Sequence, residues 1–192
     1  MSKIVVSQFL TIDGVMEGPG DHPEFDRSGW AFQFDRGEDG HKFKLDEIFA
    51  ASALLLGRVT YEGFAAAWPT RTDPMGFADR MNGMPKYVVS TTLGEPGWSN
   101  STVIRGDIAE EVVELKRRSD GDILVNGSGQ LVRTLAEHGL VDEYRLMVYP
   151  VVLGAGKRLF GDTSHAASLR LVVFGQGVGD SRLIGGRPSS AL

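Results

Sequence analysis

Three short stretches of the sequence place glycines, hydroxyl groups or a cation directly after apolar runs. They are Gly57-Arg58-Val59-Thr60 after "ALLL", Ser90-Thr91-Thr92 after "KYVV", and Asn126-Gly127-Ser128-Gly129 after "DILV". Glycine lets a backbone approach a ligand closely, and all three stretches supply hydrogen-bond donors. Such donors attract phosphate most strongly where a helix begins, because its first N–H groups are unpaired and its dipole is positive there. The pattern indicates a polyphosphate site, most simply one for a nucleotide cofactor.

Each stretch also has a simpler interpretation when it is taken alone. "NGSGQL" lacks the third glycine of a dinucleotide fingerprint, since Val132 stands there, and such a segment is often only a tight strand-to-helix turn. "GRVT" is typical of a solvated turn, and "STT" of a loop or a helix cap. The phosphate interpretation rests on the three stretches together, because they fall at equivalent strand ends.

Other kinds of chemistry find little support in the sequence. The chain has no cysteine, which excludes disulfides, a thiolate nucleophile and a cysteine-bound zinc. The run Gly154–Arg158 has Val151 where a phosphate-binding loop needs an earlier glycine, and Arg158 where it needs a hydroxyl. His22, Glu24 and Asp26 are metal-ligand types without a second cluster, so we expect them to be solvated and predict no metal site.

The surrounding elements must place these strand ends together. We expect a long loop over Asp13–Gly40, whose aromatic residues either plug the core or stack on a flat ligand ring, and a polar loop around Pro69 and Pro74. Apolar periodicity predicts strands at residues 3–9, 53–57, 86–90, 101–106, 122–126, 143–154, 168–174 and 180–184. It predicts helices at residues 43–52, 60–68, 107–119 and 128–139, with Asp107 and Glu110 forming a capping box and Gly139 ending the last helix.

Strands that alternate with helical segments favour βαβ units. The fold class predicted is α/β, a three-layer α/β/α sandwich with a mostly parallel central sheet. The last strands have no helix between them, so we expect an antiparallel C-terminal edge. No repeat or linker divides the chain, and residues 1–192 are expected to form a single domain.

Composition narrows the class of protein. Of 192 residues, 42% are hydrophobic and 23% are charged, as in folded globular proteins. A formal net charge of −5 disfavours sequence-independent binding to nucleic acid or an anionic membrane. There is no apolar run long enough to span a bilayer, and the N-terminus "MSKIVVSQFL" is unlike a signal peptide. We expect a cytoplasmic protein.

The motifs taken in order resemble a known family. "GRVTYE" and "YPVVLGAGKRLF", together with "MPKYVVSTTL" and "DILVNGSGQL", are similar to the reductase-type family typified by the C-terminal domain of the riboflavin biosynthesis protein RibD. The resemblance covers nearly all of Lys3–Phe160. It implies a dihydrofolate reductase-like fold, NADPH as the hydride donor and, often, a homodimer.

By matching position, the resemblance gives roles to the three stretches. Arg58, following Gly57, would meet the 2′-phosphate of the cofactor, and Thr60 the pyrophosphate. Ser90 and Thr91 would lie along the adenosine half. The glycine loop under the pyrophosphate and the nicotinamide ribose would comprise Gly127, Ser128, Gly129, Gln130 and Leu131. The loop covering the nicotinamide would contain Ile12, Asp13 and Gly14.

The sequence departs from the family in two respects. We expect no deaminase domain of the kind that accompanies this reductase in riboflavin biosynthesis, because the sequence has no cysteine for its zinc site. The acid of dihydrofolate reductase has no clear counterpart, because counting back from Gly57 reaches His41, with Asp39 and Asp46 nearby. Asp13 is a candidate proton donor, and its simpler interpretation is a turn residue.

The function predicted is a stand-alone NADPH-dependent reductase. It would transfer hydride to a small heterocyclic or sugar-derived substrate of the pteridine or aminopyrimidine type. One alternative is a nucleotide-binding protein of the same fold that lacks catalytic activity, and another is reduction of dihydrofolate itself. Turnover of NADPH distinguishes an enzyme from a binding protein.

Overall fold

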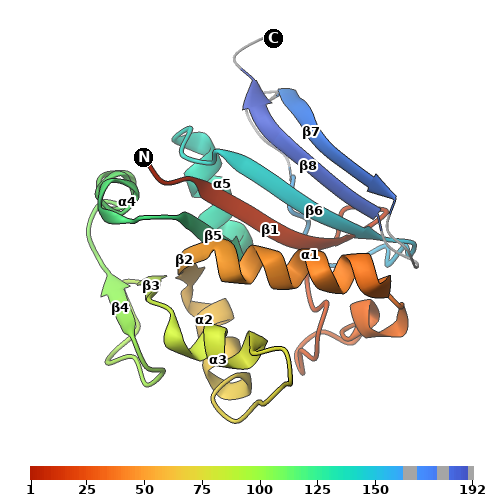
Figure 1. The fold of residues 1–192 in the computed structure, drawn as a ribbon, viewed down its shortest axis with the longest axis horizontal. Coiled ribbons are helices and arrows are strands. Elements are labelled where there is room, and N and C mark those ends of the chain that lie inside the picture. The colour runs from red at the N-terminus through yellow and green to blue at the C-terminus, as the bar shows by residue number, and fades with distance from the viewer. Residues whose placement is uncertain (162–167, 177–181, 190–192) are drawn as a thin grey trace. The chain divides into compact units, whose positions relative to one another are not determined.

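The computed structural model of the chain describes residues 1–161, 168–176 and 182–189. Its strands and helices are shown in Figure 1. The strands are β1 (Ile4–Thr11), β2 (Ala51–Gly57), β3 (Lys86–Val89), β4 (Ser101–Ile104), β5 (Asp122–Asn126), β6 (Glu143–Tyr149), β7 (Ser168–Gln176) and β8 (Arg182–Ser189). The helices are a 3₁₀ helix (Trp30–Gln33), α1 (Gly37–Ala50), α2 (Arg58–Ala67), α3 (Phe77–Gly83), α4 (Ile108–Arg118) and α5 (Gly129–Glu137).

The strands are hydrogen-bonded in the order β4-β3-β2-β5-β1-β6-β8-β7. β2 pairs in parallel with both β3 and β5, and β3 pairs in parallel with β4. β8 pairs antiparallel with β6 and with β7. The predicted fold class is therefore confirmed: the sheet of this α/β chain is mostly parallel, and its C-terminal edge is antiparallel.

The chain packs as two compact units. The first contains Met1–Val5 and Lys44–Val141, and the second contains Val6–Phe43 and Asp142–Leu192. Within the first unit, α2 and α3 lie on one face of the strands, while α4 and α5 lie on the other (Figure 1). β2 is buried from Ala53 to Leu56 without alternation, as expected for a parallel strand that is covered on both faces.

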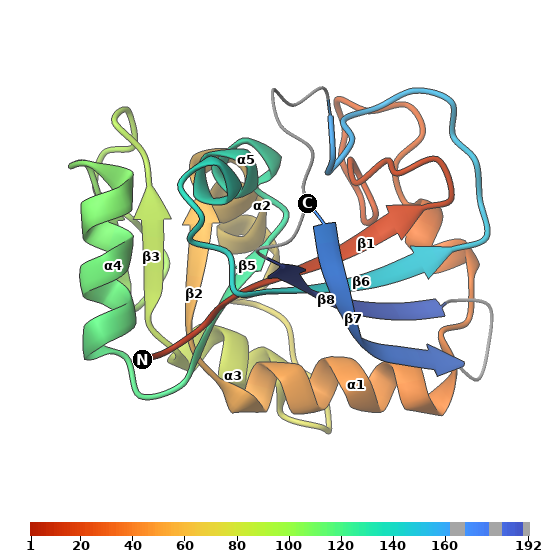
Figure 2. The same ribbon diagram turned by 90° about the horizontal axis from the view of Figure 1, so that it is seen from above.

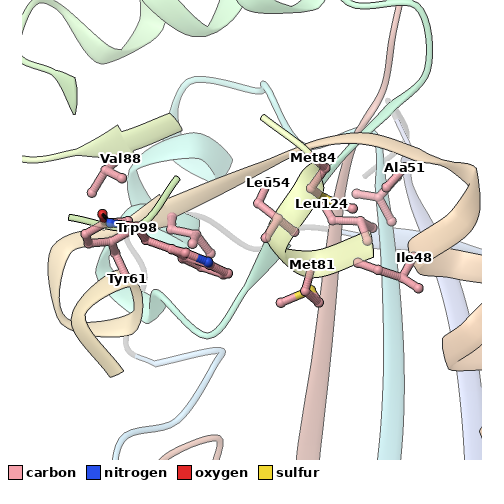
Figure 3. Close-up of a cluster of buried hydrophobic side chains, with 11 residues drawn as sticks. Ile48, Ala51, Leu54, Tyr61, Met81, Met84, Val88, Trp98 and Leu124 are labelled. Atoms are coloured by element: carbon pink, nitrogen blue, oxygen red, sulfur yellow. Dashed lines mark hydrogen bonds between the residues drawn. The ribbon is translucent and has the colours of Figure 1, made fainter. Parts of the chain in front are cut away.

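The core of the first unit joins the sheet to α2 and α3. Leu54 of β2 packs in one cluster with Tyr61 of α2 and Met81 of α3 (Figure 3). Val88 of β3 and Leu124 of β5 belong to the same cluster, so neighbouring strands share one apolar face. This packing holds the start of α2 next to the strands that precede the candidate site.

The core of the second unit is built around Tyr149 of β6. Its ring lies 5.4 Å from that of Phe9, 5.5 Å from that of Trp30 and 6.0 Å from that of Phe34, measured between centroids. The Trp30 side chain is 1% exposed, and its indole N–H donates to the backbone oxygen of Glu17 at 2.8 Å. Of the two interpretations of the aromatic residues in the long loop, Trp30 therefore follows the first: it is a core residue.

Several elements differ from the sequence prediction; β8, for example, is Arg182–Ser189 instead of 180–184, of which 180 and 181 lie outside the described residues. Three differences have a clear physical cause. α1 begins at Gly37, six residues before the predicted start, and the Asp35 carboxylate accepts from the Gly37 N–H at 2.8 Å. α3 was not predicted; the Asp73 carboxylate accepts from the N–H groups of its first residues and so stabilises its start. β6 ends at Tyr149 because Pro150 has no N–H to continue a ladder.

None of the helices in the described ranges has both the length and the apolar character that crossing a membrane requires.

Candidate functional site

The three polar stretches follow strands that are neighbours in the sheet. β2 lies between β3 and β5 and is parallel to both, so the carboxyl ends of the three strands lie at the same edge. Figure 2 shows the arrows of β2 and β3 pointing the same way. Ligands of parallel sheets bind beyond this edge. The expectation that the stretches fall at equivalent strand ends is confirmed.

Two of the stretches are joined by side-chain hydrogen bonds. The Ser128 hydroxyl accepts from the Gly57 N–H at 2.9 Å and donates to the Asn126 backbone oxygen at 3.0 Å. The Ser128 N–H in turn donates to the Thr60 hydroxyl oxygen at 2.9 Å. The start of α2 and the start of α5 are thereby tied together, and neither Thr60 nor Ser128 is a free surface hydroxyl.

The turn before α5 has an unusual backbone. Gly127 has a φ of 55°, and Ser128 follows in the left-handed region with φ 55° and ψ 42°. A Cβ on Gly127 would lie 2.7 Å from the Thr60 hydroxyl oxygen, so only glycine fits at that position. Ser128 is a strained residue, because few residues other than glycine occupy this region. Such strain is typical of functional turns.

The first turns of α2 and α5 have no side-chain cap. In α4, by contrast, the Asp107 carboxylate accepts from the Glu110 N–H at 3.0 Å, which confirms one half of the predicted capping box. Gly57 and Ser128 make no such bond to α2 and α5. Within the described residues, the N–H groups of Gly129–Leu131 find no acceptor. Two open helix N-termini whose first residues are hydrogen-bonded together could bind an anion.

The residues of α5 assigned to the cofactor are not equivalent. Gln130 is exposed, whereas Leu131 has its side chain in the core with 5% exposed. Leu131 can therefore contact a ligand only through its backbone. Gly129 is the first residue of α5 and is half-buried, which leaves its Cα beside the open N–H groups.

The third strand end is an ordered turn. The Ser90 hydroxyl accepts from the N–H groups of Thr92 at 3.2 Å and Leu93 at 2.9 Å, and Thr91 is exposed. Arg105, which follows β4, donates to the backbone oxygens of Ser90 at 3.3 Å and Leu93 at 2.7 Å. Sequence alone does not single out Arg105, although an arginine after a short strand repeats the position of Arg58 after β2.

A hollow of about 490 Å³ lies beside this turn, along β4. Its lining includes Arg105, Glu95 and Pro96 as well as the strand residues Ser101–Val103. Neither Ser90 nor any residue of the turn before α5 lines it. The hollow is therefore separate from the tied helix starts.

Arg58 is the first residue of α2, and it forms an ion pair. Its Nη1 lies 2.9 Å and 3.1 Å from the two carboxylate oxygens of Glu62, one helical turn later. Both side chains are about half exposed. In the part of the chain that the structure describes, the Nε and Nη2 groups of Arg58 contact no acceptor. One edge of the guanidinium thus remains open to a further anion.

Ile12, Asp13 and Gly14 belong to the second unit, after β1. The Asp13 carboxylate accepts from the Thr11 hydroxyl at 2.6 Å, from the Leu153 N–H at 3.2 Å and from the Gly154 N–H at 2.8 Å. These bonds, the Thr11 hydroxyl foremost, lower the pKa of Asp13 to about 2. Because the group holds no proton near neutral pH, the structure favours the interpretation of Asp13 as a turn residue over that as proton donor.

Ile12 and Gly14, the neighbours of Asp13 in the chain, have no such set of hydrogen bonds to their side-chain positions. Ile12 is 64% exposed, and its N–H donates to the Val151 backbone oxygen at 2.9 Å. Gly14 has a φ of 78°, and no atom lies within 4 Å of the position that a Cβ would take, so it serves the turn without a close contact. The apolar side chain of Ile12 is thus mostly exposed to solvent.

The other candidate acids lie on α1. Asp39, His41 and Asp46 are all exposed there. Glu47 is the buried carboxylate of this helix, with 4% exposed, and it pairs with Lys44 one turn earlier. A lysine three residues before a glutamate on a helix is the signal in the sequence that could have marked this pair. No cluster of metal-ligand side chains occurs in the described ranges.

Comparison with known proteins identifies the family of this chain. The family model described as the RibD C-terminal domain matches residues 2–178. The Bacillus subtilis protein YyaP is 31% identical over 173 residues, which cover 88% of this chain and 86% of YyaP.

Solved structures share the fold at low sequence identity. A Shewanella sp. PV-4 protein matches with a TM-score of 0.74 and 18% identity over 97% of this chain and 99% of its own. A pyrimidine reductase-like protein from Corynebacterium diphtheriae gives 0.64 and 13% over 99% and 93%. The dihydrofolate reductase of Enterococcus faecalis, in complex with NADP(H), gives 0.58 and 14% over 98% and 97%. These likenesses establish a dihydrofolate reductase-like fold.

Proposed function

Because this chain belongs to the RibD C-terminal domain family, we propose that it is an NADPH-dependent reductase. The observation that carries the proposal is the pair of uncapped helix N-termini, α2 and α5, tied together by Ser128. Their N–H groups are fixed before any ligand arrives, so a pyrophosphate would be bound without reorganising the turn. A dihydrofolate reductase with this fold has been solved with NADP(H), which supports the choice of cofactor.

Arg58 supports the phosphorylated form of the cofactor. Helices favour acidic residues in their first turn, yet α2 begins with a cation and has no acid there. The exposed ion pair with Glu62 offsets this only weakly, so Arg58 is a candidate for function. The open Nε and Nη2 edge of Arg58 suits two parallel bonds to the oxygens of a 2′-phosphate.

The proposed reaction is hydride transfer to a C=N or C=O bond of a small heterocyclic or sugar-derived substrate, of the pteridine or aminopyrimidine type. The nicotinamide supplies the hydride when the cofactor is bound. The chain would bind the cofactor's phosphates at the starts of α2 and α5. The role of the Ile12–Gly14 loop at the nicotinamide rests on the family resemblance alone. Since the pKa of Asp13 is about 2, the proton is expected to come from water or from another side chain.

A thermal scan tests the cofactor. A ligand that binds only the native protein stabilises it by about 2.7 kcal/mol at 100 times its Kd. For a chain of this length that is a rise in Tm of roughly 5–10 °C. We expect millimolar NADPH to raise the Tm by this order. An unchanged Tm would contradict the cofactor assignment, for an enzyme and for a binding protein alike.

A nucleotide-binding protein without catalysis is the second candidate. It is favoured by one observation, that Asp13 is held as a carboxylate and that Asp39, His41 and Asp46 are exposed. Loss of NADPH absorbance with a panel of pteridines, aminopyrimidines and simple carbonyl compounds distinguishes the two. Binding without turnover across the panel would favour the binding protein.

We further infer that the protein is a cytoplasmic homodimer that acts on a small molecule and binds neither nucleic acid nor membrane. The resemblance to the family supports the dimer, and the net charge of −5 supports the absence of polyanionic partners. Light scattering after size-exclusion chromatography measures the mass of the particle and so tests the dimer directly. A mass of one chain, 20.8 kDa, would contradict it.

A further inference from the structure

Glu62 places a negative charge beside the cation proposed for the 2′-phosphate. The two residues are one turn apart on α2, and a single nitrogen of Arg58, Nη1, contacts both oxygens of Glu62. The side chains are 44% and 47% exposed, so the pair lies at the surface of the first unit. A phosphate that bound Arg58 would therefore share this guanidinium with a carboxylate.

The two anions would bind different edges of the same guanidinium. Glu62 uses Nη1, and the Nε and Nη2 groups contact no acceptor among the described residues. With ordinary contact lengths on both edges, a phosphorus atom and the Glu62 carboxyl carbon would be roughly 8 Å apart. At that distance a unit charge weakens the binding of a doubly charged phosphate by about three- to tenfold in water at low salt.

The ion pair has an opposite and smaller effect. By restricting the Arg58 side chain, Glu62 lowers the entropic cost of placing the guanidinium for a ligand. An exposed pair at this spacing changes an equilibrium by only about twofold. Repulsion therefore outweighs ordering, and the net effect of Glu62 on a 2′-phosphate is unfavourable.

We propose that Glu62 is a specificity-determining residue that limits the preference of this protein for NADPH over NADH. The inference rests on the proposed function, since it requires that Arg58 meets the 2′-phosphate. NADH has a hydroxyl group there, so Glu62 scarcely affects its binding. Glu62 also makes NADPH affinity less steep in its dependence on salt, because its repulsion is screened together with the attraction of Arg58.

The test is a titration of both cofactors against Glu62→Gln, Arg58→Ala and the double variant, at about 20 mM and about 500 mM NaCl. Glutamine keeps the size of the side chain and removes its charge. We expect Glu62→Gln to bind NADPH about two- to fivefold more tightly at low salt, with NADH unchanged. The gain should fall below about twofold at high salt. It should persist in the Arg58→Ala background, because repulsion between the two anions does not pass through Arg58.

Two further variants serve as controls. Glu114→Gln removes a matched charge from α4, where Glu114 pairs with Arg117, and it should leave both affinities unchanged. Glu62→Asp keeps the charge and should not tighten NADPH. Circular dichroism checks that each variant is folded.

The possible outcomes are distinct. Unchanged or weaker NADPH binding by Glu62→Gln at low salt would overturn the inference and leave the proposed function standing. An equal gain for NADH would also overturn it, because the effect would then not act on the 2′-phosphate. If the wild-type protein bound neither cofactor, the proposed function would be wrong, and the role of Glu62 with it.

Discussion

The backbone N–H of Ser128 donates to the hydroxyl oxygen of Thr60, a residue 68 positions earlier in the chain. This bond links the turn before α5 to the first turn of α2. A second bond, from the Gly57 N–H to the Ser128 hydroxyl oxygen, joins the same two segments. Thr60 was assigned to the pyrophosphate by resemblance. The structure gives it a second role, which is to hold the two helix starts in register.

We predict that Thr60→Val weakens both the fold and the site. Valine has the shape of threonine but cannot accept the Ser128 N–H bond. Leaving that half-buried N–H unpaired should lower the free energy of unfolding by about 1–2 kcal/mol. The affinity for NADPH should fall further than stability alone explains, because the two helix starts lose their register.

Urea denaturation and cofactor titration measure the two effects of Thr60→Val separately. Thr102→Val on β4, at an exposed position, is the matched control and should change neither. Full NADPH affinity in a destabilised Thr60→Val protein would show that Thr60 serves the fold alone.

Gly129→Val is predicted to abolish NADPH binding in a protein that still folds. Gly129 is the first residue of α5 and lacks the positive φ of Gly127, so valine meets no backbone strain there. Its side chain would occupy the space in which the pyrophosphate approaches the open N–H groups.

Gly127→Ala provides the comparison. Its Cβ would lie 2.7 Å from the Thr60 hydroxyl oxygen in a left-handed backbone, so it should mainly cost stability. For Gly129→Val and Gly127→Ala alike, circular dichroism measures folding and cofactor titration measures NADPH affinity. A Gly129→Val protein that bound NADPH as the wild type does would place the pyrophosphate elsewhere.

Arg58→Ala is predicted to weaken NADPH by about ten- to hundredfold and to leave NADH nearly unchanged. The two cofactors differ only in the 2′-phosphate, and a hydrogen bond to a charged group is worth about 1.5–3 kcal/mol. Titration of both cofactors against both proteins measures the difference. Parallel, small losses would identify Arg58 as a surface residue whose partner is Glu62 alone.

Lys86 provides a prediction on stability against pH. Its side chain is fully buried, and its ammonium group donates to the backbone oxygens of Asn82, Met84 and Ser99 at 2.8–3.0 Å. It also lies over the ring of Trp98, 4.3 Å from the centroid. Desolvation on burial lowers the pKa of Lys86 from 10.5 to about 8.

Between pH 8 and 10.5 the unfolded chain therefore carries a proton on Lys86 that the folded chain lacks. The free energy of unfolding should rise over this window, by at most about 3 kcal/mol. The three oxygens and the Trp98 ring favour the charged form and reduce the rise. Urea midpoints measured across the window test this, with Lys86→Met as reference. A rise of equal size in Lys86→Met would assign it to other groups.

The sequence predicts the local elements well where one signal dominates. "DILVN" is the strand Asp122–Asn126 as expected, and Asp107 caps α4 from the predicted position. α3 escaped prediction because its start depends on Asp73, which caps from outside the helix within a segment dominated by turn residues.

The site was predictable in its residue types but not in its contacts. Glycines and hydroxyls after apolar runs marked the strand ends, because turn chemistry is local. That Thr60 would meet Ser128, or that Asp13 would pair with N–H groups some 140 residues later, depends on packing that no local pattern encodes. Glu62 lies four residues after Arg58, a helical spacing that the sequence shows. Its repulsion of a phosphate can be inferred only from the structure, which shows that Glu62 occupies Nη1 and leaves Nε and Nη2 open among the described residues.

The close approach of Gly127 to Thr60 limits which substitutions this sequence can accept in evolution. A Cβ at position 127 would lie 2.7 Å from the Thr60 hydroxyl oxygen and 2.9 Å from its methyl carbon, so any side chain there collides with this threonine. Ser128 depends on both, since its N–H needs the Thr60 oxygen and its backbone follows Gly127. The three positions are therefore epistatic: a change tolerated at one is conditional on the others, and descendants of this chain are expected to keep or replace them as a set.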